Sequence, residues 1–109
     1  MHEPTIAHEG ALRPTHLEVN RTALASNLES IRNHVTPARV MPILKANAYG
    51  HGLVETARLC ANHQASYLGL AYLEEGLRLR QEGVTLPVLI LGGILGPQIP
   101  LFIENDLTL

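Results

Sequence analysis

Four short apolar segments recur at similar intervals along this sequence, and the stretches between them carry the pattern of helices. The segments are centred near Ile43, Leu68, Leu89 and Thr108. Strands that are apolar throughout and alternate with helices are typical of a parallel sheet covered by helices. Four such units correspond to half of an eight-stranded (β/α)8 barrel. We therefore predict an α/β fold that is a partial (β/α)8 TIM-type barrel, about the first half of the barrel.

Local patterns of apolar, capping and helix-breaking residues predict the individual elements. The predicted strands cover 15–20, 39–45, 66–71, 87–93 and 106–109, and the predicted helices begin near Thr22, Leu53 and Leu73 and after Pro97. Thr22 is predicted to cap the first helix, and Pro37 discourages its continuation. Gly83 is placed to end the third helix. Pro42 is awkward inside a strand because its nitrogen carries no hydrogen to donate.

Helical spacing also predicts which side chains these helices bury. The apolar face of the first helix is Leu24, Leu28, Ile31 and Val35. The apolar face of the second helix is Leu53, Val54, Ala57, Cys60 and Ala61. Cys60 is therefore predicted to be a core residue and not a nucleophile.

Composition narrows the function classes. The 109 residues are 46% hydrophobic and 17% charged, with a formal net charge of -2. This balance offers no electrostatic footprint for nucleic acid or an anionic membrane. The single Cys60 excludes an internal disulfide and fits a reducing cytosol. Residues 1–12 have neither periodicity nor the apolar core of a secretory signal, so we expect a flexible lead-in to a soluble, intracellular domain.

The stretch "PILKANAYGHG" (42–52) places Lys45 at the end of a predicted apolar strand. Alternation puts Lys45 on the same strand face as Ile43, and reactive residues of a (β/α) barrel gather where strands end. Aliphatic neighbours such as Ile43 and Leu44 favour the neutral form of an amine, which is nucleophilic toward aldehydes. These features suit a lysine that binds pyridoxal phosphate (PLP) covalently. From position alone, a strand-end lysine that extends into water is the more common alternative.

The residues after Lys45 favour the cofactor hypothesis. Gly50 and Gly52 stand where a backbone turns tightly or approaches a ligand closely. The hydroxyl of Tyr49, four residues after the lysine, can donate to a phosphate oxygen. His51 lies in the same turn and is predicted to orient it or to partner Tyr49. We therefore expect a phosphate-bearing ligand beside this turn.

Other candidate sites carry weaker signals. The six histidines are scattered over different predicted elements without the spacing of zinc ligands, so no metal site is predicted. The glycines of "GGILGP" (92–97) lack both the lysine of a P-loop and the spacing of a dinucleotide-binding loop. That segment is predicted to be a plain turn between a strand and a helix.

One octapeptide and two longer stretches carry a resemblance to a known family. The octapeptide "KANAYGHG" (45–52) resembles the PLP-attachment signature of the alanine racemases, which are PLP enzymes of fold type III. The stretch "HLEVNRTALASNLESIR" is similar to the family's opening strand and helix. The stretch "LGLAYLEEGLRLRQEGVTLPVLILGG" is similar to its next two strands and the helix between them. Residues 13–109 are therefore expected to form the N-terminal portion of a racemase-like PLP-binding barrel domain.

This resemblance implies roles for five residues. Lys45 matches the lysine that holds PLP and exchanges the substrate proton on the D-alanine side. Tyr49 matches a tyrosine whose hydroxyl contacts the cofactor phosphate. Ile43, Leu89 and Leu91 match apolar positions near the PLP ring, and Leu89 and Leu91 share one strand face.

The resemblance also implies an activity. It is alanine racemase activity, the PLP-dependent interconversion of L-alanine and D-alanine that supplies peptidoglycan synthesis in the bacterial cytoplasm. The family's second base is a tyrosine of the C-terminal domain, contributed by the partner subunit of a homodimer. We therefore expect this chain to be an N-terminal fragment that is inactive alone. The alternatives are a serine or broad-specificity amino-acid racemase, and a non-catalytic PLP-binding chain.

Overall fold

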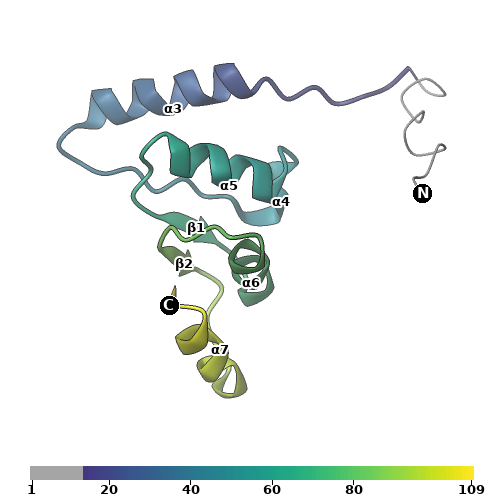
Figure 1. Ribbon diagram of the computed structural model, residues 1–109, viewed down its shortest axis with the longest axis vertical. Coiled ribbons are helices and arrows are strands. Elements are labelled where there is room, and N and C mark those ends of the chain that lie inside the picture. The colour runs from purple at the N-terminus through teal and green to yellow at the C-terminus, as the bar shows by residue number, and fades with distance from the viewer. Residues whose placement is uncertain (1–13) are drawn as a thin grey trace.

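The computed structural model describes residues 14–109, whose strands form one parallel sheet (Figure 1). The sheet has the order β1-β2-β3, with β1 at Leu68–Leu70, β2 at Val88–Ile90 and β3 at Leu107–Thr108. An isolated parallel bridge between Ile43 and Gly69 adds a fourth segment beside β1. Strand order therefore follows chain order, as in a (β/α) barrel. The prediction of a partial barrel is confirmed.

Helices separate the parallel segments, as the sequence pattern predicts. The helices are α3 (Arg21–Val35), α4 (Lys45–Tyr49), α5 (Leu53–Asn62), α6 (Leu73–Gln81) and α7 (Ile99–Glu104), with a short 3-10 helix η1 at Gly96–Gln98. Gly83, the second residue after α6, has a φ of 84°, so its predicted role in ending that helix is confirmed. An ion pair of 3.4 Å joins Arg21 of α3 to Glu55 of α5. None of the helices in residues 14–109 has both the length and the hydropathy needed to cross a bilayer.

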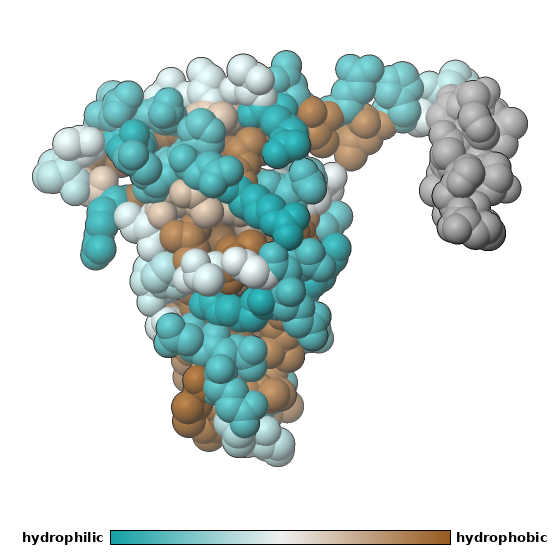
Figure 2. Space-filling view, viewed as in Figure 1, coloured by the Kyte–Doolittle hydropathy of each residue, from teal (hydrophilic) through white to brown (hydrophobic). Residues whose placement is uncertain are grey.

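The two faces of the sheet differ in how far their side chains are buried. Side chains that alternate toward the helices are buried: Leu68, Leu70, Val88 and Ile90. On the opposite face, Ile43 and Leu91 stay 37% and 53% exposed. Hydrophobic side chains also reach the surface along α7, at the lower end of the molecule in Figure 2, where Ile99 and Ile103 are exposed. The face that points into a complete barrel is thus open in residues 14–109, and we call it the open face.

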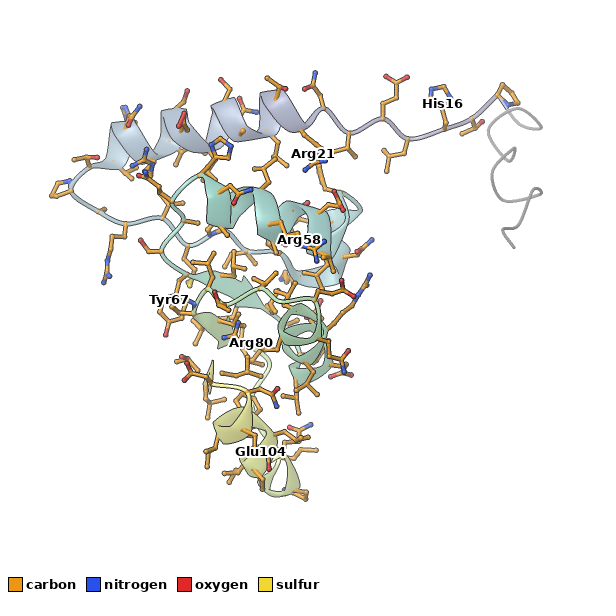
Figure 3. All side chains as sticks on the ribbon, in the orientation of Figure 1. His16, Arg21, Arg58, Tyr67, Arg80 and Glu104 are labelled. Carbon is orange, nitrogen blue, oxygen red and sulfur yellow. The ribbon has the colours of Figure 1, made fainter. Side chains whose placement is uncertain are left out.

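Arg80 lies near the C-terminal end of α6 and connects this helix to two later loops. Its guanidinium donates to the carbonyl oxygens of Val84 and Leu86 at 2.9 Å, and to those of Asn105 and Asp106 at 2.8 and 3.0 Å (Figure 3). Desolvation lowers the pKa of this guanidinium. One side chain therefore satisfies carbonyl groups both before β2 and before β3.

The predicted strand at 15–20 and the predicted cap at Thr22 are wrong. Residues 15–20 form no strand, because no neighbouring strand in residues 14–109 pairs with them, and Leu17 is 75% exposed. Helix α3 begins at Arg21, and the side chain of Asn20 accepts a hydrogen bond from the Ala23 N–H at 2.9 Å. Asn20 is the better cap because its backbone is extended and its short amide reaches the third residue of the helix.

The predicted strand at 39–45 is realised only in part. The Ser66 N–H donates to Val40, the Gly69 N–H donates to Pro42, and the Leu44 N–H donates to Gly69. Pro42 has no N–H to add to this ladder, and the pairing reduces to a single bridge. The segment nevertheless lies beside β1 in parallel register.

The predicted apolar face holds at most positions of α5 but only in part on α3, where Leu24 is half-buried. Leu28 is the buried residue of α3, whereas Ile31 and Val35 are exposed. On α5 the predicted Ala61 is exposed, and Thr56 and Leu59 are buried instead. Cys60 is buried as predicted, and this burial raises the pKa of its thiol to about 11. The predicted lead-in at 1–12 lies outside the described residues.

Candidate functional site

Lys45 is the first residue of α4, whose backbone is a left-handed turn at the end of the first parallel segment. The next four residues all have positive φ: 54° at Ala46, 57° at Asn47, 53° at Ala48 and 51° at Tyr49. Each non-glycine residue in this conformation costs about 1–2 kcal/mol, and a run of them is unusual. The sequence predicted a turn here but assigned its geometry to the glycines. Strain of this kind persists only where surrounding contacts hold it.

Asn47 supplies much of that support. Its side-chain oxygen accepts from the Leu53 N–H at 2.8 Å and so caps the start of α5. Its backbone carbonyl accepts from the N–H groups of Gly50 and Gly52 at 3.0 and 3.1 Å. Asparagine also tolerates the left-handed region better than most residues do. The turn and α5 are therefore joined at one residue.

Replacing Asn47 with alanine is expected to destabilise the fold by about 2 kcal/mol, because the change removes a helix cap and leaves a residue less suited to positive φ. Asn47→Gly loses the cap but keeps the backbone freedom, so a loss of only about 1 kcal/mol is expected. Denaturant unfolding of both variants measures the difference. Equal losses in the two variants would show that backbone strain is not part of the cost.

His51 also holds the turn. Its Nδ1 lies 2.9 Å from the Ala48 carbonyl oxygen, so Nδ1 carries the hydrogen and donates. Of its two predicted roles, His51 therefore takes that of orienting the turn. Within residues 14–109 its ring makes no hydrogen bond to Tyr49, whose side chain is 66% exposed. The Tyr49 hydroxyl is thus left accessible to a ligand.

The surroundings of Lys45 differ from the expected aliphatic pocket. Leu44 is only 5% exposed and packs in the core on the helix side of the sheet, whereas Lys45 is exposed. Leu44 therefore cannot desolvate the amine, and that expectation is wrong for the described residues. Ile43 lies on the open face, as alternation predicts. Lys45 is also the only lysine of the 109 residues.

Gly69 allows Ile43, one of the predicted ring-contacting residues, to pack closely over β1. A Cβ placed at Gly69 would collide with Ile43 Cδ1 and would lie 3.8 Å from Leu91 Cδ1. Leu89 alternates onto the same face and is half-buried. The structure thus brings Ile43 and Leu91 together around Gly69. Sequence reasoning missed Gly69, although a glycine between two buried leucines of a strand signals the close approach of another group.

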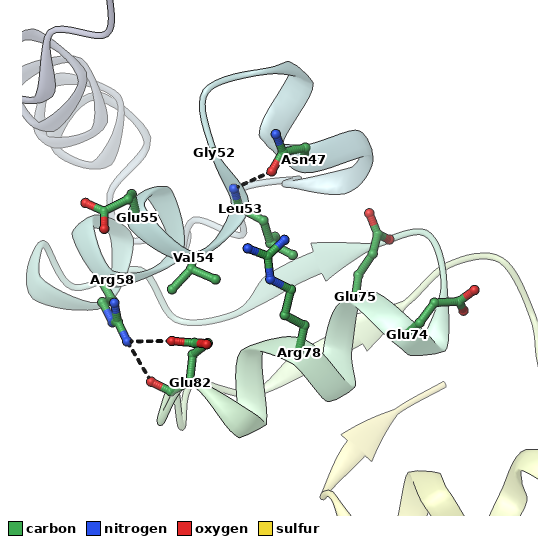
Figure 4. Close-up of a pocket in the computed structure, with 10 residues that line it drawn as sticks. All are labelled: Asn47, Gly52, Leu53, Val54, Glu55, Arg58, Glu74, Glu75, Arg78 and Glu82. Carbon is green, nitrogen blue, oxygen red and sulfur yellow. Dashed lines mark hydrogen bonds and ion pairs between the residues drawn. The ribbon is translucent and has the colours of Figure 1, made fainter. Parts of the chain in front are cut away.

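A separate open cleft of about 820 Å³ lies on the helix side of the turn (Figure 4). It is lined by Asn47, Gly52, Leu53, Val54, Glu55, Arg58, Glu74, Glu75, Arg78 and Glu82. Arg58 donates to the Glu82 carbonyl oxygen at 2.9 Å and pairs with its carboxylate at 3.3 Å. Lys45 is absent from the lining, so this cleft does not explain the lysine. In the described part of the chain, no cluster of three or more His, Cys, Asp or Glu residues is arranged to hold a metal ion.

Comparison with known protein families shows which family this chain is similar to. The family model described as "Alanine racemase, N-terminal domain" matches residues 19–109. The chain belongs to this family. Alanine racemases are PLP-dependent isomerases.

The relatives are much longer than this chain. This chain is 39% identical over 97 residues to the alanine racemase of Methanococcus maripaludis. The match covers 88% of this chain and 26% of the relative. The chain thus spans between about a fifth and a quarter of the length of the curated relatives it matches.

Solved racemase structures share the fold. The alanine racemase of E. faecalis matches with a TM-score of 0.82 and 34% identity, over 90% of this chain and 27% of that one. The Bacillus anthracis alanine racemase with bound L-Ala-P matches at 0.78 and 33% identity, over 82% and 23%. A histidine racemase from Leuconostoc mesenteroides matches at 0.75 and 36% identity, over 82% and 24%. The family fold therefore serves more than one amino-acid racemase.

Proposed function

We propose that this chain supplies the lysine side of a PLP-dependent alanine racemase site, with Lys45 as the residue that holds the cofactor. The observation that carries the proposal is the placement of the chain's only lysine. It is exposed at the carboxyl end of the first parallel segment, two residues after the bridge between Ile43 and Gly69. Carboxyl ends of barrel strands are where such folds place reactive groups.

The chemistry of the neighbouring residues fits PLP. An amine is needed for its aldehyde, an apolar surface for its ring and hydrogen-bond donors for its phosphate. Lys45 offers the amine, and Ile43, Leu89 and Leu91 offer the apolar surface. Tyr49 offers a phenolic donor at the turn. Gly69 contributes to this surface by letting Ile43 pack against β1, because a side chain at position 69 would collide with Ile43 Cδ1. When bound, PLP supplies an electron sink for the carbanion formed at the substrate Cα.

Lys45 would also move a proton at the substrate. We assign its amine to removing and returning the Cα proton on the D-alanine side. Inversion requires a second acid/base group on the opposite face of the planar carbon. We propose that this group comes from the partner subunit of a homodimer, and that the D-alanine formed in the bacterial cytoplasm serves peptidoglycan synthesis. The 109 residues alone are accordingly expected not to racemise alanine.

A second candidate keeps the chemistry and changes the substrate to serine or a broader set of amino acids. The match to a histidine racemase favours keeping this candidate. A third candidate is a PLP-binding chain without catalysis.

A racemisation assay of the natural protein that contains this sequence separates the candidates. With PLP present, we expect D-alanine to form from L-alanine faster than D-serine or D-histidine forms from its L-enantiomer. A preference for serine or histidine would replace the alanine assignment. PLP binding without turnover of any of the three would favour the non-catalytic chain.

A further inference from the structure

Glu75 links the first residue after Lys45 to the carboxyl end of β1. Its Oε2 accepts a hydrogen bond from the Ala46 N–H at 3.0 Å. Its Oε1 accepts from the N–H groups of Ala71 and Tyr72, both at 2.9 Å. Figure 4 shows the Glu75 side chain extending from the first turn of α6 toward the turn that carries Asn47. One carboxylate thus receives three backbone donors from two separate segments.

Two of these three contacts have an ordinary structural purpose. Glu75 is the third residue of α6, and its bond to the Tyr72 N–H is the glutamate half of a capping box. The adjacent Ala71 N–H shares the same oxygen. A carboxylate near a helix N-terminus also interacts favourably with the helix dipole. These contacts explain why a glutamate stands at this position, but they use only Oε1.

The third contact reaches 29 residues back along the chain, to the point where the left-handed turn begins. Ala46 has a φ of 54° and a ψ of 51°, a conformation that an alanine keeps only when its surroundings hold it. The Leu44 N–H, which donates to Gly69 at 2.8 Å, fixes the backbone just before Lys45. The bond from Ala46 to Glu75 fixes it just after. Lys45 is therefore held between two anchors that both belong to the β1–α6 unit.

We propose that Glu75 is a positioning residue for Lys45, which sets the direction of the lysine side chain by anchoring the turn to the end of β1. This inference rests on the proposed function, because it assigns to Lys45 the covalent attachment of PLP. Glu75 does not contact the reacting atoms in this account. It acts through the Ala46 backbone, and its charge strengthens the hydrogen bond that it accepts there.

A glutamine at position 75 separates the two tasks of this side chain. An amide retains one acceptor oxygen, and its NH₂ group cannot accept from an N–H. With the oxygen on the side of Ala71 and Tyr72, Glu75→Gln keeps two bonds and the helix cap while losing the bond to Ala46. The neighbouring Glu74 lies in the same first turn, is exposed and lacks these contacts, so Glu74→Gln is a matched control for the lost charge.

The test titrates PLP into the natural protein that contains this sequence and follows the visible absorbance of lysine-bound PLP. We expect Glu75→Gln to weaken PLP binding about tenfold, as the loss of one charge-assisted hydrogen bond implies, and Glu74→Gln to leave it unchanged. Amide hydrogen exchange should quicken at 46–50 in Glu75→Gln but remain as in the wild type across α6. This exchange measurement does not depend on activity.

The outcomes separate the two proposals. If the wild type binds PLP and Glu75→Gln binds it equally well, with unchanged exchange at Ala46, the positioning role is wrong and the function of Lys45 stands. If exchange at Ala46 quickens but PLP affinity does not fall, the anchor exists without positioning the lysine, and the inference also fails. If the wild type gives no lysine-bound PLP, the proposed function itself is overturned.

Discussion

Replacing Lys45 with alanine is expected to abolish covalent PLP binding in the natural protein that contains this sequence. The chain has no other lysine, so within these 109 residues no second side chain can take over the attachment. Lys45 is exposed, and we therefore expect its removal to change the free energy of unfolding by no more than about 0.5 kcal/mol. Absorbance titration with PLP and denaturant unfolding measure the two effects separately.

Arginine at position 45 is the matched control. Lys45→Arg keeps the positive charge and most of the length of the side chain, but a guanidinium stays protonated and is a poor nucleophile toward aldehydes. We expect this variant to lose the lysine-bound absorbance as completely as the alanine variant does. Retention of that absorbance in either variant would contradict the assignment of Lys45.

Replacing Arg80 with methionine is expected to destabilise the domain by about 3 kcal/mol, because four backbone carbonyls lose a charged donor at once. Two of these carbonyls precede β2 and two precede β3, so this side chain connects the loops that lead into both strands. Methionine fills much of the same volume, which isolates the hydrogen bonds from the packing of the side-chain stem. The free energy of unfolding in urea is the measurement.

Two controls separate the hydrogen-bonding geometry of Arg80 from its charge. Arg80→Lys keeps the charge but cannot reproduce the planar fork that reaches both loops, so an intermediate loss is expected. Arg78 lies on the same helix and is exposed, and Arg78→Met is expected to cost no more than about 0.5 kcal/mol. If Arg80→Met were as mild as Arg78→Met, the bonds to the two loops would not hold the domain together.

The parts of the fold that the sequence predicted well are those whose pattern is local. Strands β1 and β2 stand out because residues such as Leu68, Leu70, Val88 and Ile90 lie in short apolar runs and are buried against the helices. The segment 15–20 has an equally clear alternation, but a strand also needs a neighbour to pair with, and none is present in residues 14–109. Alternation alone cannot supply that information.

The turn after Lys45 was not predictable in its geometry. Ala46, Ala48 and Tyr49 each disfavour positive φ, so residue preferences argue against the conformation that they adopt together. Contacts with neighbouring elements stabilise the turn, among them the bond from Leu53 to Asn47 and the bond from Ala46 to Glu75. In the sequence, a glutamate near the start of a helix indicates a cap. The additional bond of Glu75 to the Ala46 N–H is visible only in the three-dimensional structure.

The residues of the candidate site could be predicted from the sequence, but the packing and burial around them could not. Lys45, Tyr49, Ile43, Leu89 and Leu91 follow from the family signature and from strand alternation. From its position alone, Lys45 could also be explained as a strand-end lysine that extends into water. The expected desolvation by Leu44 failed because that side chain turns to the helix side of the sheet. The close packing of Ile43 over Gly69 arises from a bridge between segments far apart in the sequence.

Peptide mapping of the PLP-bound protein tests the central claim most directly. The natural protein that contains this sequence is incubated with PLP, and borohydride makes any bond between PLP and a lysine amine permanent before digestion and mass spectrometry. The account predicts the added pyridoxyl phosphate mass on the peptide that carries Lys45, and its loss in Lys45→Ala. A protein that binds PLP with the label on any other residue would contradict it.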